Sequence, residues 1–249
     1  MTMKVVVLAA GFATRLYPLT RNCPKPLLDV AGKPVLTRLL DRVLALEEVD
    51  EVVVVTNDRF REAFEEWAVG YQTSVALRVL SDGTDTNENR LGAVADMAVG
   101  MEALADLDAP VLVVAGDNLI DFDLGPYAAR FGREQRTLLL VREIPDPVPP
   151  GRFSEVSMAE NGTIAGFREK PDDPQSNLSA VCLYFFPGSI RSELAQYASE
   201  NHNLDAPGYF LEWLHGHHPM GAAPIAGTFH DIGNLETLES ARAAFTTDD

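Results

Sequence analysis

The 249-residue sequence predicts an α/β protein built on a doubly wound, mostly parallel open sheet. Short apolar runs at 5–9, 51–56 and 111–115 each end close to a glycine or a polar residue. Such runs are typical of strands that are buried on both faces of a parallel sheet. Helical patterns lie between them, and 46% hydrophobic residues suffice for one large core. In such sheets ligands bind at the carboxyl ends of the strands.

Three helices are predicted in the first half of the chain. Apolar residues recur at helical spacing in 34–46, 59–69 and 91–104. Pro34 stands where the first helix begins, and proline is favoured in a first turn because its missing N–H is not needed there. Asp58 precedes the second helix and is expected to cap it.

The sequence changes in character after residue 141. Prolines crowd the stretch 145–150, which is expected to be a linker. Two runs with strand character follow, at 153–158 and 164–168, and Glu-Asn-Gly at 160–162 can form the turn between them. We therefore predict a β-hairpin or small lobe that either adds to the sheet or folds over its open edge.

The chain then returns to regular structure. An apolar run at 180–186 predicts the last strand, and 235–245 predicts a closing helix. We interpret the 249 residues as a single domain with two halves, 1–143 and 144–249, the second of which includes the closing helix.

The charge of the chain limits its partners. There are 37 acidic and 20 basic side chains, for a formal net charge of −17. Such a surface repels nucleic acid and anionic membranes, so neither is an expected partner. Phosphorylated small molecules stay possible ligands, because backbone N–H groups and a few basic residues can bind phosphate inside an acidic shell.

Cysteine content and the N-terminal sequence suggest a location. Cys23 and Cys182 are too few for a disulfide framework or a four-thiolate zinc site. The apolar run at 5–10 is shorter than the core of a signal peptide and far shorter than a membrane span. The sequence therefore predicts a cytoplasmic protein.

The most informative segment is Leu-Ala-Ala-Gly-Phe-Ala-Thr-Arg-Leu at 8–16, directly after a predicted strand. A turn of small residues exposes consecutive N–H groups that can hold phosphate oxygens. Arg15, and Lys25 in the following Cys-Pro-Lys-Pro-Leu, bring positive charge to the same place. The segment is neither a P-loop nor a G-x-G-x-x-G motif. A plain tight turn with two solvated cations is the alternative.

The full pattern resembles the signature of the sugar-phosphate nucleotidyltransferases, and among them the glucose-1-phosphate thymidylyltransferases. The resemblance continues through most of the chain in the family's order, at Pro-Lys-Pro-Leu-Leu, Gly32-Lys-Pro34, Gly116-Asp-Asn118, Phe167-Arg-Glu-Lys-Pro171, Ser176-Asn177 and His230-Asp-Ile-Gly233. It implies transfer of a nucleoside monophosphate from an NTP to a sugar 1-phosphate, with release of pyrophosphate. It also implies Mg²⁺ as cofactor and a homo-oligomer.

The resemblance implies that 1–143 is the nucleotide-binding half, that 144–249 is the acceptor-binding half with the closing helix, and that the hairpin or lobe lies over the acceptor site. It also assigns site residues. Those expected to be catalytic are Arg15, Lys25 and Asp117. Those expected to bind the nucleotide are Leu8, Ala10, Gly11, Thr14, Arg15, Asn87, Gly92 and Asp117. Those expected to bind the acceptor are Ser154, Glu169, Lys170, Asn177 and Ala180. Asp117 and Asp231 are expected to bind Mg²⁺, which prefers hard oxygen ligands.

Each assignment has a plainer alternative. Asp117 and Asp231 could be helix or turn caps, and Glu169 with Lys170 could be an exposed ion pair of little energetic value. Pro171 disfavours helix for the preceding residue, so Lys170 is expected at an extended strand end. The reaction needs no general base, because the attacking phosphate oxygen is already an anion; the site must supply placement and positive charge.

Three positions depart from the thymidylyltransferase pattern. Ala13 stands where the family often has glycine, and alanine lacks the backbone freedom of glycine. Nucleotide binding is therefore expected to survive if the φ of Ala13 is negative. Asn87 stands near the position of a base-reading glutamine and offers the same amide from a shorter stem. Ser154 replaces a glycine beside the sugar, which predicts an altered acceptor pocket.

Other functions stay open at this point. The acceptor could be phosphocholine, a phosphonate or a cyclitol phosphate instead of a sugar 1-phosphate. Asp121-Phe-Asp123 is similar to the Asp-x-Asp of nucleotide-sugar glycosyltransferases, although the string is short and common. A non-catalytic sugar-nucleotide sensor is disfavoured, because the charged positions of the signature are all present.

Overall fold

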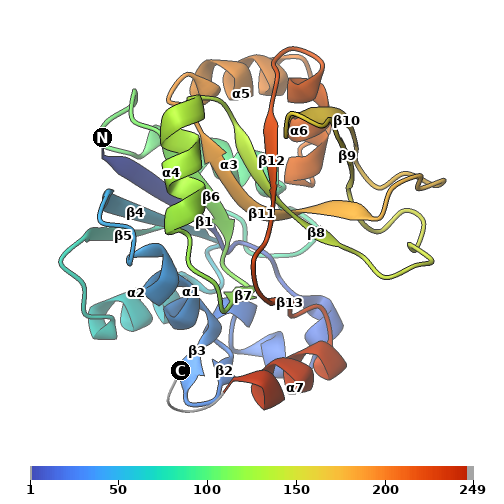
Figure 1. The fold of residues 1–249 in the computed structure, drawn as a ribbon. Coiled ribbons are helices and arrows are strands. Elements are labelled where there is room, and N and C mark those ends of the chain that lie inside the picture. The colour runs from blue at the N-terminus through green and yellow to red at the C-terminus, as the bar shows by residue number, and fades with distance from the viewer. Residues whose placement is uncertain (1, 246–249) are drawn as a thin grey trace.

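A seven-stranded sheet forms the centre of the computed structural model, which describes residues 2–245 (Figure 1). Its order is β12-β8-β11-β6-β1-β4-β5, and β11 runs antiparallel to both of its neighbours while the other pairings are parallel. The strands are β1 (Met3–Leu8), β4 (Val49–Thr56), β5 (Ala76–Ser81), β6 (Val111–Ala115), β8 (Leu138–Glu143), β11 (Leu178–Phe186) and β12 (Gly221–Pro224). The predicted fold class is confirmed.

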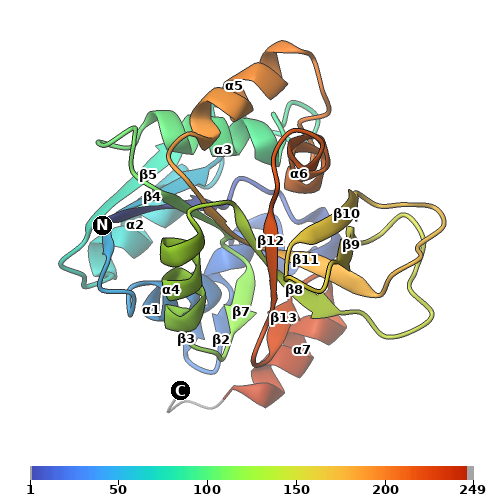
Figure 2. The same cartoon turned by 45° about the horizontal axis from the view of Figure 1, so that its top comes forward.

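Helices cover both faces of this sheet, because successive side chains of a strand point to opposite faces. Val5 and Val7 of β1 pack with one group of helices, and Val6 packs with the other. The first group is α1 (Val35–Val43), α2 (Arg61–Gly70) and α4 (Gly125–Glu134). The second is α3 (Ala93–Glu102), α5 (Ile190–Ser199) and α6 (Pro207–His215). In Figure 2, α3, α5 and α6 lie above the sheet and α1 and α4 below it.

Smaller elements gather at the carboxyl ends of β1 and β6. They are the 3₁₀ turns Thr14–Leu16, Leu19–Arg21 and Lys25–Leu27, the ribbon of β2 (Asp29–Val30) with β3 (Lys33–Pro34), and the ribbon of β7 (Asn118–Ile120) with β13 (Phe229–Asp231). Helix α7 (Leu235–Ala244) packs on them through a separate apolar cluster that includes Leu16, Leu119 and Ile232. Asn234 and Thr237 form its capping box.

The predicted hairpin is confirmed as β9 (Glu155–Met158) paired with β10 (Ile164–Arg168). Gly162 in its turn has a φ of 78°, a conformation that glycine adopts without strain. Of the two arrangements expected, the hairpin does not extend the large sheet but forms a sheet of its own. It is seen beside β11 in Figures 1 and 2.

Two expectations about the elements are wrong. Asp58 does not cap α2, which starts at Arg61 after Phe60; its carboxylate instead accepts a hydrogen bond from the Ser81 hydroxyl at 2.5 Å. The strand at 180–186 is not the last, because β12 and β13 follow it. Within residues 2–245, no helix has the length and apolar character needed to cross a bilayer.

Candidate active site

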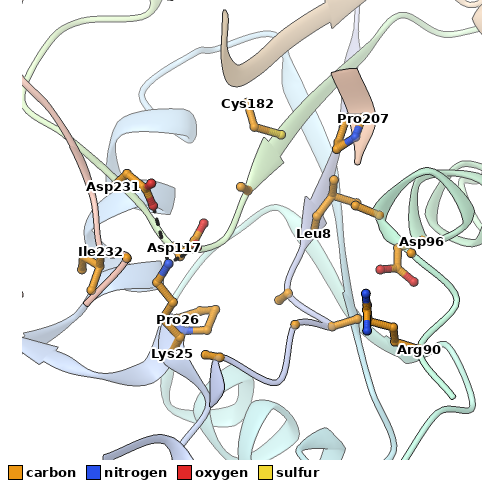
Figure 3. A pocket seen from close by; sticks show the side chains of 18 of the residues that line it. Leu8, Lys25, Pro26, Arg90, Asp96, Asp117, Cys182, Pro207, Asp231 and Ile232 are labelled. Atoms are coloured by element: carbon orange, nitrogen blue, oxygen red, sulfur yellow. Dashed lines mark hydrogen bonds and ion pairs between the residues drawn. The ribbon is translucent and has the colours of Figure 1, made fainter. Parts of the chain in front are cut away.

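A cavity of about 450 Å³ lies at the carboxyl ends of β1 and β6 (Figure 3). These neighbouring parallel strands end in register, with Leu8 opposite Ala115. Both residues line the cavity, together with the loop that follows each strand, the start of α3 and the segment after β13. The location is the one expected for a ligand of a doubly wound sheet.

The loop after β1 is anchored through its carbonyl groups. The Asn57 side chain donates to the carbonyl of Ala10 at 2.8 Å, and the Thr20 hydroxyl donates to that of Ala13 at 2.8 Å. Within the described chain, the N–H groups of residues 10–13 have no hydrogen-bond partner. Ala10, Gly11 and Ala13 line the cavity. Consecutive free N–H groups beside a cavity are suited to binding an anion.

Ala13 departs from the negative φ considered above. Its φ is 47° and its ψ is 42°, in the left-handed region. For a residue with a Cβ this conformation costs about 1–2 kcal/mol relative to right-handed backbone. The family's glycine would adopt the same conformation without that strain, so alanine keeps the loop shape at a cost in stability.

Two carboxylates converge on one ammonium group at the edge of the cavity. Lys25 Nζ lies 2.5 Å from Asp117 Oδ2 and 3.6 Å from Asp231 Oδ1. The Lys25 side chain is 13% exposed, and those of Asp117 and Asp231 are 28% and 50% exposed, so a ligand in the cavity can reach the carboxylates. In Figure 3 the three side chains lie together on one side of the pocket.

Strand pairing explains how these distant residues meet. Asp117 follows β6, and β7 begins at the next residue, Asn118. Strand β13 pairs antiparallel with β7 and places Asp231 opposite Asn118. The Asn118 side chain donates to the carbonyl of Cys182 at 2.8 Å and so ties the ribbon to β11. The two aspartates are therefore held by backbone pairing, and neither caps a helix.

The donor set fits a magnesium ion bound together with substrate. Asp117 and Asp231 already share a cation in the form of the Lys25 ammonium. Mg²⁺ in phosphoryl-transfer sites is commonly held by one or two carboxylates, with water and phosphate oxygens completing its shell. Within the described residues, no group of three or more His, Cys, Asp or Glu side chains could hold a metal by itself. A metal here would thus depend on phosphate oxygens.

The opposite end of the cavity is built where α3 begins. Gly92 has a φ of 100°, and a Cβ there would overlap the carbonyl of Leu204. This close approach lets the carbonyl of Asp205 accept from Ala93 N–H at 3.2 Å. The Asp205 carboxylate also pairs with the Arg90 guanidinium at 3.1 Å. Gly92, Arg90 and Asp205 all line the cavity.

Two further acidic residues line this end of the cavity, Asp82 and Asp96. The Asp82 carboxylate accepts from the N–H and the hydroxyl of Thr84, both at 2.8 Å. Asp96 on α3 is only 6% exposed. Burial, together with the charge of Asp82 and a hydrogen bond to it, raises the pKa of Asp96 to about 7.

The residues predicted to bind the acceptor lie in two groups. Glu169 and Lys170 follow β10 and lie against α6. Burial raises the pKa of Glu169, although the nearby Lys170 lowers it. Lys170 Nζ lies 3.7 Å from Glu169 Oε1 and 5.6 Å from the ring centroid of Tyr209. A Cβ on Gly208 would overlap the Glu169 carboxylate, so the glycine lets α6 approach this closely.

Lys170 is not the extended residue that its neighbour Pro171 predicts. Its φ is 49°, in the left-handed region. Strained backbone of this kind persists only where the surroundings hold it, and it is frequent at ligand sites. The plain ion-pair interpretation also fits Glu169 poorly, because its side chain is only 7% exposed.

The second acceptor group lies at the start of β11. The Ser154 hydroxyl oxygen accepts from Ala180 N–H at 3.0 Å, and the carbonyl of Asn177 accepts from Ile144 N–H at 2.7 Å. Ala180 lies on the same face of the strand as Cys182, which lines the cavity. This group therefore adjoins the cavity without lining it.

The structure brings most of the predicted nucleotide and metal residues together, but not all. The cavity is lined by Leu8, Ala10, Gly11, Arg15, Lys25, Gly92, Asp117 and Asp231. Thr14 and Asn87 are not among its lining residues; the Asn87 carbonyl accepts from the Arg90 guanidinium at 3.1 Å. The five acceptor residues lie outside its lining as well.

The sequence-based prediction missed Asp82, Arg90, Asp96 and Asp205. Only Asp96 had a readable signal, because it is an acid in a helix whose residues Val94, Met97 and Met101 are buried and apolar.

Comparison with known proteins gives consistent results. A sequence model of the family described as nucleotidyl transferase matches residues 4–248. The chain is 31% identical to UTP–glucose-1-phosphate uridylyltransferase AglF of Haloferax volcanii over 76% of the chain and 73% of that protein. It is 29% identical to glucose-1-phosphate thymidylyltransferase of Streptomyces griseus over 98% of the chain and 67% of that protein. A structure of UTP-bound UGPase from Acinetobacter baumannii superposes with a TM-score of 0.79 at 18% identity, covering 100% of the chain and 95% of that protein.

Proposed function

The chain belongs to the nucleotidyl transferase family, and on that premise we propose that it transfers a nucleoside monophosphate from an NTP to a sugar 1-phosphate. The products are a nucleoside diphosphate sugar and pyrophosphate. The observation that carries the proposal is the convergence of Asp117 and Asp231 on Lys25, at the edge of a cavity that is also lined by residues of the loop after β1 whose N–H groups have no partner in the described chain. Carboxylates for a metal, a cation and N–H donors are the groups that nucleotidyl transfer requires.

In the proposed reaction, a phosphate oxygen of the acceptor attacks the α-phosphorus of the NTP. A bond forms between them, and the bond from the α-phosphorus to the oxygen that bridges to the β-phosphate breaks. Pyrophosphate leaves with the electron pair of that bond. The attacking oxygen is an anion at neutral pH, so no side chain has to remove a proton.

The protein's contribution is placement and charge. The N–H groups of residues 10–13 and the side chain of Arg15, which lines the cavity, would hold the β- and γ-phosphates. Lys25 would move from the carboxylates to the phosphates when the NTP binds. Mg²⁺ bound by Asp117 and Asp231 would supply neutralisation of charge on the α-phosphate.

The acceptor would bind on the hairpin side of this cavity. Lys170 would contact the acceptor phosphate, and Glu169 would accept hydrogen bonds from sugar hydroxyls. Ser154, Asn177 and Ala180 would form the floor. A non-sugar acceptor such as phosphocholine, a phosphonate or a cyclitol phosphate would use the same phosphate contact without requiring Glu169.

The structure does not favour a glycosyltransferase. Asp121 Oδ1 accepts from Thr228 N–H at 2.6 Å, and Asp123 Oδ1 accepts from Gly125 N–H at 2.8 Å. The Asp123 carboxylate thus stabilises a turn, that of Asp121 joins two segments distant in the sequence, and neither residue lines the cavity.

Pyrophosphate release tests the proposal. The full chain is incubated with Mg²⁺, each of five NTPs and a panel of sugar 1-phosphates and non-sugar phosphates. We expect acceptor-dependent pyrophosphate release that is lost in Asp117→Asn and kept in Asp123→Asn, a matched change at a turn. Release of nucleoside diphosphate, or turnover that Asp117→Asn leaves intact, contradicts the proposal.

A further inference from the structure

A second, smaller pocket of about 180 Å³ adjoins the active-site cavity. Asp231 lines both, so the two share the edge that carries the proposed metal site. The lining of the smaller pocket includes Arg142 of β8, Arg152 and Phe153 of the segment before β9, and Phe229 of β13. Pockets that hold a drug-sized ligand have about 300–1,000 Å³, so this one is suited to a single small group.

Two arginines give this pocket its positive charge. Within residues 2–245, neither Arg142 nor Arg152 forms an ion pair, although the chain has 37 acidic side chains. The Arg142 guanidinium donates a long hydrogen bond to the carbonyl of Phe229, at 3.5 Å. The acidic residue of the lining is Asp231, and its Oδ1 lies 3.6 Å from Lys25 Nζ. The two guanidinium groups are therefore available to an anionic ligand.

Aromatic rings hold the two guanidinium groups close to each other. Arg142 Cζ lies 4.9 Å from the ring centroid of Phe229 and 5.9 Å from that of Phe153, and Arg152 Cζ lies 5.0 Å from that of Phe153. Burial lowers the pKa of Arg142; Asp231 raises it, and the charge of Arg152 lowers it. Like charges held together are unfavourable, and an anion bound by both removes the repulsion. Guanidinium groups bind carboxylate and phosphate through paired N–H donors.

The pocket lies against residues that are predicted to bind the acceptor. Arg142 stands directly opposite Ser179 in the antiparallel pair of β8 and β11, so both side chains point to the same face of the sheet. Ser179 Oγ lies 3.1 Å from Ser154 Oγ, and Ser154 follows Phe153 of the pocket lining. An acceptor that extends from a metal at Asp231 to Ser154 therefore passes along this pocket.

We propose that Arg142 and Arg152 bind a second anionic group of the acceptor, so that the preferred acceptor carries a carboxylate or a further phosphate besides the phosphate that reacts. Uronic acid 1-phosphates and sugar bisphosphates are acceptors of this class. The inference deepens the proposed function and rests on it, because it concerns the acceptor of that reaction. The other anion of the reaction that could occupy the pocket is pyrophosphate.

Matched pairs of acceptors test the inference. Glucose, galactose and mannose 1-phosphates are compared with their uronic acid 1-phosphates and 1,6-bisphosphates, with Mg²⁺ and the NTP that gives the fastest pyrophosphate release. Each uronic acid differs from its parent only in a carboxylate that replaces the hydroxymethyl group. We expect kcat/KM for at least one acceptor with the second anionic group to exceed that of its parent by about tenfold or more, as one charge-assisted contact implies.

Variants connect this preference to the pocket. Arg152→Gln removes an exposed charge and should bring the two kcat/KM values to within about threefold, and Arg142→Gln should do the same. Because Arg142 packs against two rings, Arg152→Gln keeps the inference testable if Arg142→Gln does not fold. Arg133→Gln, an exposed change on α4, is the matched control and should keep the preference.

Each remaining outcome has one meaning. Absence of the preference in every pair overturns the inference, and so does a preference that both arginine variants keep. An equal loss of kcat/KM for both members of a pair overturns it too, because it indicates a structural role. Weaker inhibition by pyrophosphate in the variants, with an unchanged acceptor preference, would assign the pocket to the leaving group instead. Absence of pyrophosphate release with every acceptor contradicts the proposed function itself.

Discussion

Replacing Asp96 by asparagine should change how the stability of the protein depends on pH. The pKa of Asp96 rises from 3.8 to about 7 in the folded chain. Between these values the folded state keeps a proton that the unfolded state has released, so stability falls as pH rises. Above about pH 7 both states are ionised and the loss is complete. The full difference corresponds to about 4 kcal/mol at 1.36 kcal/mol per unit.

Comparison of the variant with the wild type isolates this effect. A carboxyl group whose pKa is lowered by folding, such as Glu155, increases the free energy of unfolding as the pH rises toward about 4.5. This contribution is the same in both proteins and cancels in the comparison. His230 titrates in both and also cancels. From about pH 5 to about pH 8, the free energy of unfolding of Asp96→Asn should therefore rise by about 2–3 kcal/mol relative to the wild type.

Urea denaturation at several pH values measures this difference. The midpoint and slope are fitted at each pH for the wild type, Asp96→Asn and the exposed control Glu102→Gln. The control should parallel the wild type. A wild-type curve that runs parallel to that of Asp96→Asn across this range would refute the reasoning, since it would mean that Asp96 is ionised in the folded chain at pH 5.

Three further predictions concern the loops and the reaction. Asp117→Ala and Asp231→Ala should each abolish Mg²⁺-dependent pyrophosphate release and leave the circular dichroism spectrum unchanged. The double variant should lose little more activity than either single variant, because the effects of ligands that act as a unit are not additive. Near-normal activity of either single variant would rule out the metal assignment. Lys170→Ala should weaken acceptor binding by about 1.5–3 kcal/mol, the value of a charge-assisted contact, and leave NTP binding intact. The two affinities are measured by calorimetric titration of each substrate, and an equal loss for both would be incompatible with this role. Ala13→Gly should raise the free energy of unfolding by about 1 kcal/mol, since relief of the left-handed strain outweighs the extra entropy of glycine when unfolded; a fall in urea stability would show that the lost methyl contacts dominate.

The sequence revealed the central strands because burial on both faces leaves a continuous apolar run. β1, β4 and β6 are of this kind. β5 lies at the sheet edge with a half-exposed pattern that includes Arg78, so its apolar residues do not form such a run. β12 has four residues and β13 has three, too few for a periodicity to be read.

The residues of the site could be predicted from the sequence where they belong to a recognisable motif. Asp117 and Asp231 were found from their motifs, but their meeting depends on the pairing of β7 with β13, which no local pattern records. Asn87 was assigned from its spacing to Gly92. The intervening loop instead brings Arg90, which pairs with Asp205, to the cavity lining.

The most direct test of the account follows the atoms in the products. The full chain is supplied with Mg²⁺, an NTP labelled with ³²P at either the α- or the γ-phosphate, and a sugar 1-phosphate with ¹⁸O in its phosphate. The account predicts α-label in the nucleoside diphosphate sugar, γ-label in pyrophosphate, and all the ¹⁸O kept in the sugar nucleotide, including the new bridging oxygen. Label appearing as nucleoside diphosphate and inorganic phosphate, or ¹⁸O lost from the sugar nucleotide, would contradict nucleotidyl transfer to the acceptor phosphate.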